Sequence, residues 1–278
     1  MGLRINQNTD AFNSYRNLSV TQGQMSKSLE KLSSGFRINR AADDAAGLAI
    51  SEGLRSQVGG LKVAVRNAQD GVSVVQTAEG ALTEVHSILQ RVRDLAVQAG
   101  NDSNNASSRA AIKTESDSLA DELTRIGDST NFNGTKLLDG SASALTFQVG
   151  ASDVAAESQV VVDLSGADIS TMGATIKALT FATSGNALAS ITAVDTAIGT
   201  VSTQRASLGA VQNRFEHTIN SLNVAVENLS ASESRIRDTD MAAEMMNFTR
   251  ANILSQAGTA MLAQANSAPQ SVLQLLRG

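Results

Sequence analysis

Residues 54–99 read LRSQVGGLKVAVRNAQDGVSVVQTAEGALTEVHSILQRVRDLAVQA, and this stretch decides the fold class. Its apolar residues recur in alternating steps of four and three, which keeps one stripe on one face of a helix. The stripe comprises Leu54, Val58, Leu61, Val65, Ala68, Val72 and Val75, and it then rotates to Ala78, Leu82, Val85, Leu89, Val92, Ala96 and Ala99. Asp43 and Asp44 suit the positive end of a helix dipole, so the pattern predicts one helix of about 60 residues that ends at Gly100. An ordinary globular helix has three or four turns, so this one needs partners along its length.

Further stripes with the same alternation lie toward both ends of the chain. The first is formed by Ala11, Tyr15, Leu18, Gln22, Met25, Leu29 and Leu32. A second is formed by Leu208, Val211, Phe215, Leu222, Ala225, Leu229 and Ile236, and a third by Ala243, Met246, Ile253, Ala257 and Ala260. They predict terminal helices, with Gly35 as the stop of the first and Pro269 ending or bending the last.

The middle of the chain predicts shorter elements. Apolar and polar residues alternate over 145–149 and again over 160–164, which predicts a β-hairpin or a small sheet. Residues 165–187 are rich in Ser, Thr, Gly and Ala with weak periodicity, and this composition predicts loops. Helical periodicity returns near Ile191.

Two further signals complete the prediction of the fold. Residues 100–108 predict a loop, and apolar spacing over 112–126 predicts a third helix. Asn133-Gly134 is a strong turn signal. Only 3% of the residues are aromatic and one is proline, which suits long helices packed side by side. The predicted fold class is mainly α, an elongated antiparallel helical bundle or coiled coil of N- and C-terminal helices with a small β-hairpin region in the middle.

Composition and charge exclude several classes of site. The chain has no cysteine for a thiolate metal site, and no run of about 18 apolar residues that would cross a membrane. Its 27 acidic and 22 basic residues argue against a nucleic-acid partner. His86 and His217 stand outside any metal-binding motif, and a helix start explains Asp43 and Asp44 better than acid–base catalysis does. The sequence predicts no catalytic residue, no metal and no cofactor.

Five segments resemble those of bacterial flagellins and follow the order of that family. They are SSGFRINRAADDAAGLAIS at 33–51, QRVRDLAVQ at 90–98, NFNGTKLLDG at 131–140, RASLGAVQNRF at 205–215 and ANSAPQSVLQLLR at 265–277. The resemblance covers about residues 1–140 and 190–278. Because the middle is short, it implies a short flagellin that lacks most of the variable outer domains.

The resemblance implies three regions along the chain. Residues 1–40 and 240–278 would form an inner coiled coil that lines the channel of a filament. Residues 41–138 and 188–239 would form an outer helical core. Residues 139–187 would form a β-hairpin with loops, as a reduced variable region.

It also implies function, partners and location. The chain would be a structural subunit, not an enzyme, that polymerises with copies of itself into the helical flagellar filament, the propeller of swimming motility. An export chaperone, a cap and hook-junction proteins would be its other partners. It would lie outside the bacterial cell after export without a cleaved signal peptide, in agreement with the polar residues 1–10.

The stripes differ in what is available to cover them. Those at 54–99 and 208–236 are best explained as the core of an intramolecular bundle. The two stripes at the chain ends have little else to cover them, so they predict a self-assembly surface. Its residues are Ala11, Tyr15, Leu18, Met25, Leu29, Leu32, Ala243, Met246, Ile253, Ala257 and Ala260. A head-to-tail contact that does not close into a ring generates a helical fibre.

The resemblance alone suggests a second site. In many flagellins the segment that matches QRVRDLAVQ is recognised by a vertebrate Toll-like receptor. The matching residues are Arg91 and Leu95, with Glu115 on the adjoining helix. The alternative is that all three are ordinary packing and surface residues.

Three other functions compete with a filament subunit. A hook–filament junction protein would share the terminal helices without polymerising alone. A filament-borne hydrolase is disfavoured by the absence of HExxH and by the short middle. An adhesive module would need a sizeable outer domain.

Overall fold

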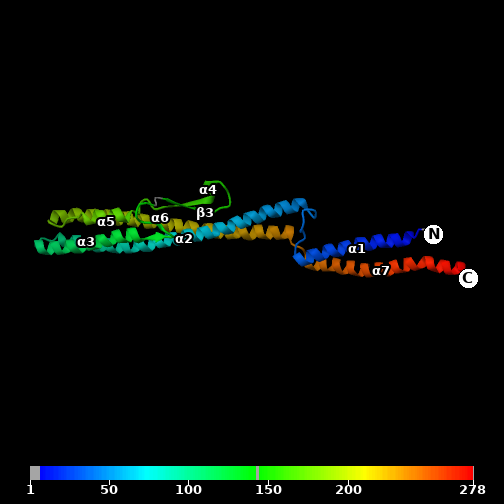
Figure 1. Cartoon of the computed structure of the whole chain (residues 1–278). Coiled ribbons are helices and arrows are strands. Elements are labelled where there is room, and N and C mark those ends of the chain that lie inside the picture. Colours follow the sequence, from blue (N-terminus) through cyan, green and yellow to red (C-terminus); the bar gives the residue numbers. More distant parts are fainter. Residues whose placement is uncertain (1–6, 142–143, 278) are drawn as a thin grey trace. The chain divides into compact units, whose positions relative to one another are not determined.

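The computed structural model describes residues 7–141 and 144–277, with only the backbone described from residue 269 onward. The chain divides into two compact units: unit 1 comprises Met1–Ser56 and Asn228–Gly278, and unit 2 comprises Gln57–Glu227. The fold is mainly α, as the sequence predicts (Figure 1). The elements are α1 Thr9–Ser34, α2 Ala45–Ala99, α3 Ala106–Ser129, β1 Asn131–Phe132, β2 Thr135–Lys136, β3 Ala144–Gln148, α4 Ala155–Ser158, β4 Gln159–Asp163, α5 Ile169–Lys177, α6 Ser184–Arg237 and α7 Met241–Arg277.

The long helix predicted from the opening stretch is present as α2, which spans 55 residues. Its start is fixed by Asp44, whose Oδ1 accepts a hydrogen bond from the N–H of Gly47 at 2.9 Å. A short acidic side chain just before a helix satisfies N–H groups that have no partner within the helix. Asp43 lies in the turn before it, so only one of the two predicted carboxylates caps the helix.

The core of unit 2 draws on α2, α3 and α6. Leu82, Leu89, Leu123 and Leu208 are fully buried in one cluster, which confirms the apolar stripe as a core face over this part of α2. Phe215 of α6 is also fully buried, and its ring meets Phe147 of β3 edge-on with centroids 5.6 Å apart. Such edge-to-face pairs add to the apolar burial of large rings.

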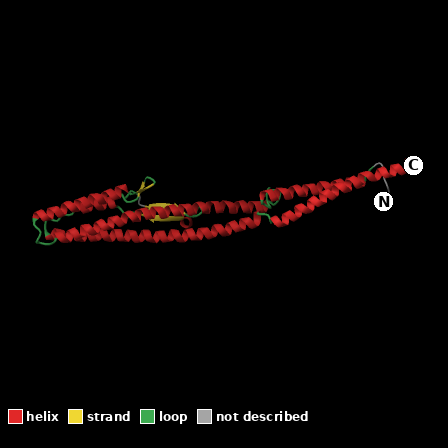
Figure 2. Ribbon diagram, turned by 90° about the horizontal axis from the view of Figure 1, so that it is seen from below, coloured by secondary structure: helices red, strands yellow, loops and turns green. Residues whose placement is uncertain are grey.

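The predicted turn and the predicted small sheet in the middle of the chain are both present. The β1–β2 hairpin turns at Asn133 and Gly134, whose φ angles of 48° and 83° lie in the left-handed region that Asn and Gly tolerate. Strands β3 and β4 pair antiparallel, with Leu145 opposite Val162 and Phe147 opposite Val160. The strands are yellow in Figure 2.

The prediction of loops over residues 165–187 is wrong. This stretch contains α5 and the start of α6. Asp168 caps α5 by accepting from the N–H of Thr171 at 2.9 Å, and Ile169 and Ile176 on one face are fully buried. Gly173 lets α5 approach α3 closely, because a Cβ there would meet the backbone N of Thr124 at 2.9 Å. Small residues that permit close packing here weaken the apolar periodicity on which the prediction relied.

Three predicted boundaries also move. The loop over 100–108 is shorter, because Asn105 caps α3 by accepting from the N–H of Ser108 at 2.8 Å. Helix α6 begins at Ser184 and not near Ile191. Pro269 does not end the last helix, since α7 continues to Arg277.

In unit 1, α1 and α7 run antiparallel and side by side (Figures 1 and 2). The predicted stop at Gly35 is confirmed: its φ is 77°, and its N–H bonds to the carbonyl oxygen of Lys31 at 2.8 Å. Within the described part of the chain, no helix has the length and hydropathy needed to span a membrane.

Candidate functional site

The seam between α1 and α7 combines small or polar residues with five large apolar residues. The inward residues of α1 are Ala11, Ser14, Leu18, Thr21, Met25, Ser28 and Leu32. Those of α7 are Glu244, Phe248, Ala251, Ser255, Gly258, Leu262 and Ala265. Among all of these only Leu18, Ser28 and Ala251 are fully covered. The intramolecular seam therefore buries little apolar surface.

Two contacts set the register of this seam. Leu18 packs over Gly258, where an added Cβ would lie 3.3 Å from Leu18 Cδ1. Asn8 makes a double connection: its Oδ1 accepts from the N–H of Ala11 at 3.0 Å, and its Nδ2 donates to the carbonyl oxygen of Ala265 at 2.7 Å. Pro269 has no N–H, so it cannot supply the helical hydrogen bond to Ala265. The amide of Asn8 satisfies the carbonyl that the proline leaves without this donor.

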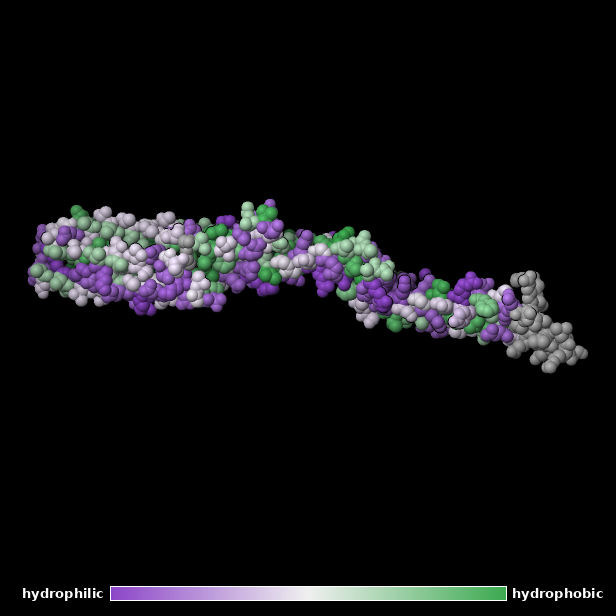
Figure 3. All heavy atoms as spheres, turned by 45° about the horizontal axis from the view of Figure 1, so that its top comes forward, coloured by the Kyte–Doolittle hydropathy of each residue, from purple (hydrophilic) through white to green (hydrophobic). Residues whose placement is uncertain are grey.

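The outer faces of both helices carry large apolar side chains in contact with water. On α1 they are Phe12, Tyr15, Val20 and Leu29, and on α7 they are Met241, Met245, Met246, Ile253, Leu254 and Met261. Phe12 and Met246 are 68% and 66% exposed. On the face drawn in Figure 3, hydrophobic residues are interspersed with hydrophilic ones over this helix pair. Apolar exposure on this scale is typical of a protein-binding surface.

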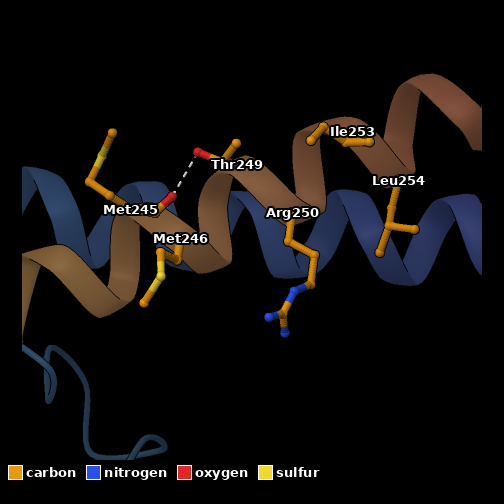
Figure 4. Close-up of a pocket in the computed structure, with 6 residues that line it drawn as sticks. All are labelled: Met245, Met246, Thr249, Arg250, Ile253 and Leu254. Carbon is orange, nitrogen blue, oxygen red and sulfur yellow. Dashed lines mark hydrogen bonds between the residues drawn. The ribbon is translucent and has the colours of Figure 1, made fainter.

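Part of the α7 face forms a shallow apolar groove of about 490 Å³. Met245, Met246, Ile253 and Leu254 line it (Figure 4). The hydroxyl of Thr249 turns back on the helix and donates to the carbonyl oxygen of Met245 at 2.8 Å, so it offers no donor to a partner. This face suits apolar contact.

The predicted self-assembly residues fall into two sets. Ala11, Leu18, Met25 and Leu32 lie in the seam, and Ala243 is half-buried. Tyr15, Leu29, Met246, Ile253, Ala257 and Ala260 are exposed. The predicted stripe of α1 is thus split, with every second member inside the chain. Sequence reasoning missed Phe248, Gly258 and Leu262, which line the seam; Gly258 in the middle of a helix was the one signal available.

A cluster of contacts joins the segment after α1 to the segment between α6 and α7, all within unit 1. Arg37 N–H donates to the carbonyl oxygen of Arg237 at 2.7 Å, and Thr239 N–H donates to Gly35 at 2.9 Å. The Arg237 guanidinium lies 4.8 Å from the centroid of the Phe36 ring and pairs with Glu52 at 2.7 Å. A largely buried arginine that holds both an aromatic face and a carboxylate fixes this crossing.

One carboxylate in this segment is held by backbone N–H groups. Asp43 Oδ2 accepts from the N–H of Arg40 at 3.0 Å and of Asn39 at 3.2 Å. These two hydrogen bonds, with smaller help from Lys27 and Lys31, lower the pKa of Asp43 below its ordinary value of 3.8. The turn that links α1 to α2 is therefore organised around an ionised side chain.

The three residues of the predicted receptor site differ in their exposure: Arg91 and Glu115 are exposed, and Leu95 is buried. Arg91 of α2 pairs with Glu115 of α3, with Nη2 and Oε1 2.6 Å apart, and about half of each side chain is exposed. Leu95 is only 2% exposed and packs in a cluster with Ile112 and Phe181. Arg91 and Glu115 are accessible to a partner as a pair, whereas Leu95 is not accessible in this conformation.

Nδ1 of His86 is buried and has no hydrogen-bond partner among the described residues. His86 Nε2 lies 3.0 Å from Gln90 Nε2, one helical turn away. Within residues 7–141 and 144–277, no group of three or more His, Asp or Glu side chains is arranged to hold a metal ion.

Comparison with known proteins identifies the family. The family model for the N-terminal helical region of bacterial flagellin matches residues 5–143, and that for the C-terminal helical region matches residues 191–276. The chain belongs to the bacterial flagellin family. It is 54% identical over 273 residues to a flagellin of Halalkalibacterium halodurans, covering 98% of this chain and 99% of that one. It is 51% identical over 305 residues to a flagellin of Bacillus subtilis, covering 99% and 100%.

A solved structure gives a further point of comparison. The crystal structure of Bacillus cereus flagellin is 33% identical, with a TM-score of 0.49, and the match covers 56% of this chain and 88% of that one. Membership of the flagellin family makes the chain a structural subunit of the flagellar filament, which lies outside the cell, and not an enzyme. The matches give no support to the hook–filament junction alternative.

Proposed function

We propose that the α1–α7 pair is the element through which copies of this flagellin assemble, and that its exposed apolar residues form the contacts between copies. The observation that supports this is the imbalance within the pair. The seam fully covers only Leu18, Ser28 and Ala251, whereas ten large apolar side chains of the two helices are among those exposed to water. Long helices need tertiary partners to stay folded, and a second copy supplies them.

The proposal includes the layout implied by the resemblance. Residues 1–40 and 240–278 line the filament channel, 41–138 and 188–239 surround them, and 139–187 face outward. The seam fits this layout, because ten large apolar side chains of the pair remain exposed and available to neighbouring subunits.

Seeded elongation tests the proposal. Leu29→Asp and Ile253→Asp should each raise the critical concentration for elongation of filament seeds about tenfold or more, since a contact worth about 1.4 kcal/mol is lost. Leu188→Asp is the matched control, because Leu188 is 67% exposed on α6 in unit 2. Electron microscopy of the products measures elongation directly. Wild-type elongation by both α1–α7 variants would contradict the proposal.

An exposed apolar face also needs cover before assembly. This supports an export chaperone that binds α7, and contacts of the α1–α7 pair with cap and hook-junction proteins at the filament ends. Copurification of the full chain with its chaperone should be lost in Met246→Asp with Met261→Asp and retained in Leu188→Asp. If the chaperone is recovered equally with the wild-type chain, the double variant and Leu188→Asp, it binds elsewhere.

The proposal extends to the N-terminus of the exported subunit. Asn8 caps α1 and donates a hydrogen bond to Ala265, so the cap and the contact with α7 both require this residue near the start of the chain. We therefore expect export without cleavage of a signal peptide. The intact mass of the subunit from sheared filaments tests this: a mass that corresponds to loss of Asn8 would overturn it.

Receptor recognition is a second function that one observation favours. Arg91 and Glu115 form an exposed pair on adjoining helices of unit 2, which suits direct contact with a host Toll-like receptor. Arg91→Asp should lower receptor activation by the monomer about tenfold. Arg125→Asp is the control, because Arg125 pairs with Glu122 on the same helix and is equally exposed. Leu95→Ala should act only through packing, so its effect should follow the stability of unit 2.

A further inference from the structure

A second groove of unit 1 lies between α1 and α7 and differs from the apolar groove in its lining. It encloses about 370 Å³ and is walled by Lys27, Ser28 and Lys31 from α1 and by Glu244, Asn247 and Arg250 from α7. Arg250 and Leu254 line both grooves, so the two grooves are adjacent on α7. Three cations face one carboxylate in this second groove.

The cations of this groove lack partners in the described part of the chain. Neither Lys27 nor Lys31 nor Arg250 forms an ion pair or a side-chain hydrogen bond there. Of the nearby acidic residues, Glu30 pairs with Arg40 at 2.8 Å, and Asp43 is bound by backbone N–H groups and attracts Lys27 and Lys31 without forming an ion pair with them. Within the groove only Glu244 offsets the positive charge, which leaves an excess of two cations.

The charge of the helix pair is opposite to that of the rest of the chain. Helices α1 and α7 hold five basic and three acidic residues. The chain as a whole holds 22 basic and 27 acidic residues, so 17 basic and 24 acidic residues lie outside the pair. A copy of this chain is therefore a source of carboxylates for another copy.

We infer that the groove lined by Lys27, Lys31 and Arg250 receives acidic side chains of a second copy of this chain. The inference rests on the proposed function, because the groove is adjacent to the apolar face assigned to assembly. The apolar contacts hold copies together without fixing their register. A polar site beside them selects one register, because carboxylates that miss the groove lose their cationic partners.

Zero-length crosslinking tests the inference on the unmodified protein. Filaments grown from equal amounts of isotopically light and heavy chains are treated with a carbodiimide, which joins a lysine amine to a carboxylate in direct contact. Mass spectrometry should find Lys27 or Lys31 linked to an acidic residue. Crosslinked peptides that join a light chain to a heavy chain identify links between copies. Links from these lysines only within one copy, for example to Asp43 or Glu244, would overturn the inference.

Charge reversal provides an independent measurement. Lys27→Glu with Lys31→Glu should raise the critical concentration for seeded elongation about tenfold, and Lys27→Gln with Lys31→Gln should raise it less and weaken its dependence on salt. Lys62→Glu is the control, because Lys62 is an exposed lysine of unit 2. Unchanged elongation by the double glutamate variant would also overturn the inference.

The two proposals fail in different ways. If Leu29→Asp and Ile253→Asp block elongation while the lysines neither crosslink between copies nor affect elongation, the apolar face assembles the filament and the groove does not contribute. If the apolar variants elongate normally while the lysines crosslink between copies, the groove takes part in assembly and the apolar face does not.

Discussion

The core of unit 2 and the seam between α1 and α7 are both built on residues spaced three and four apart, but they bury different side chains. In unit 2 the spacing places leucines, valines and Phe215 out of contact with water. In the α1–α7 seam it places Ser14, Thr21, Ser28 and Gly258 inside and leaves Tyr15 and Leu29 outside. The same spacing therefore closes a fold in one region and leaves an open face in the other.

The difference has an energetic consequence. Complete burial of a large apolar side chain contributes about 1.5–3 kcal/mol, and unit 2 has many such side chains. In the seam Leu18 is 8% exposed and the other large apolar side chains are only partly buried, so the pair gains less stability from its own packing. We expect unit 2 to determine the stability of the monomer and the α1–α7 pair to determine association.

The largest effect should come from the same substitution made in each region. Phe215→Ala removes a fully buried ring and should destabilise the monomer by about 3–5 kcal/mol. Phe12→Ala removes a ring that is 68% exposed and should change stability by less than about 0.5 kcal/mol. Urea unfolding followed by circular dichroism measures both. Similar losses of stability for the two variants would refute the distinction between the regions.

A smaller effect tests how tightly the unit 2 core is packed. A Cβ at Gly71 would lie 2.6 Å from Cζ of Phe215, so Gly71→Ala should overpack the core and destabilise the monomer by about 1–3 kcal/mol. Gly80 lies on the same helix with nothing within 4 Å of an added Cβ. Gly80→Ala should stabilise the protein by up to about 1 kcal/mol through helix propensity. The free energy of unfolding in urea should fall in Gly71→Ala and rise in Gly80→Ala. Changes of the same sign in both variants would contradict this packing.

Elements that carry local sequence signals could be predicted, whereas elements that depend on distant contacts could not. The helix from Ala45 to Ala99 and the turn at Asn133-Gly134 carry strong local signals, so they could be predicted. Helix α5 was missed because Gly173 and the exposed threonines dilute its apolar pattern. Gly173 acts through α3, a neighbour that is distant in the sequence, and a local pattern does not reveal the neighbour.

The candidate assembly face was predicted in part for a similar reason. Apolar spacing identifies the side of α1 that carries Leu18 and Leu29. It does not show that Leu18, and not Leu29, packs against α7. That choice depends on Gly258, which admits Leu18, and on Asn8, which fixes the register through Ala265. Both are contacts across more than two hundred residues of sequence.

The hydrogen bond from Asn8 to Ala265 should contribute about 1 kcal/mol to the stability of the α1–α7 pair, as is typical of one hydrogen bond. Asn8→Ser keeps a side-chain oxygen that caps α1 but loses the amide that donates to Ala265. Hydrogen exchange of the backbone near residues 9–18 and 255–265 in filaments should become faster. Pro269→Ala restores an N–H for Ala265, so Asn8→Ser should cost less in that background. An equal cost with and without Pro269 would show that the proline is not the reason for the contact.

The smallest effect concerns the turn after α1 in acid. The pKa of Asp43 is lower in the folded protein than its ordinary value of 3.8, so the ionised carboxylate stabilises the turn above that value. This stabilisation is lost as the pH falls through the lower folded pKa, because protonation weakens the hydrogen bonds from Arg40 and Asn39. Asp43→Asn should weaken the turn above pH 3.8 and remove the additional loss below it.

Pepsin, which is active in acid and cleaves beside phenylalanine, reports on this turn through the exposed Phe36. Cleavage there should accelerate as the pH falls below 3.8 in the wild-type protein, and much less in Asp43→Asn. Cleavage at the buried Phe215 serves as the internal reference, since it follows the core of unit 2. If both sites accelerate together in both proteins, acid opens the whole chain at once, and the contrast between a stable core and a weakly held terminal pair does not extend to this turn.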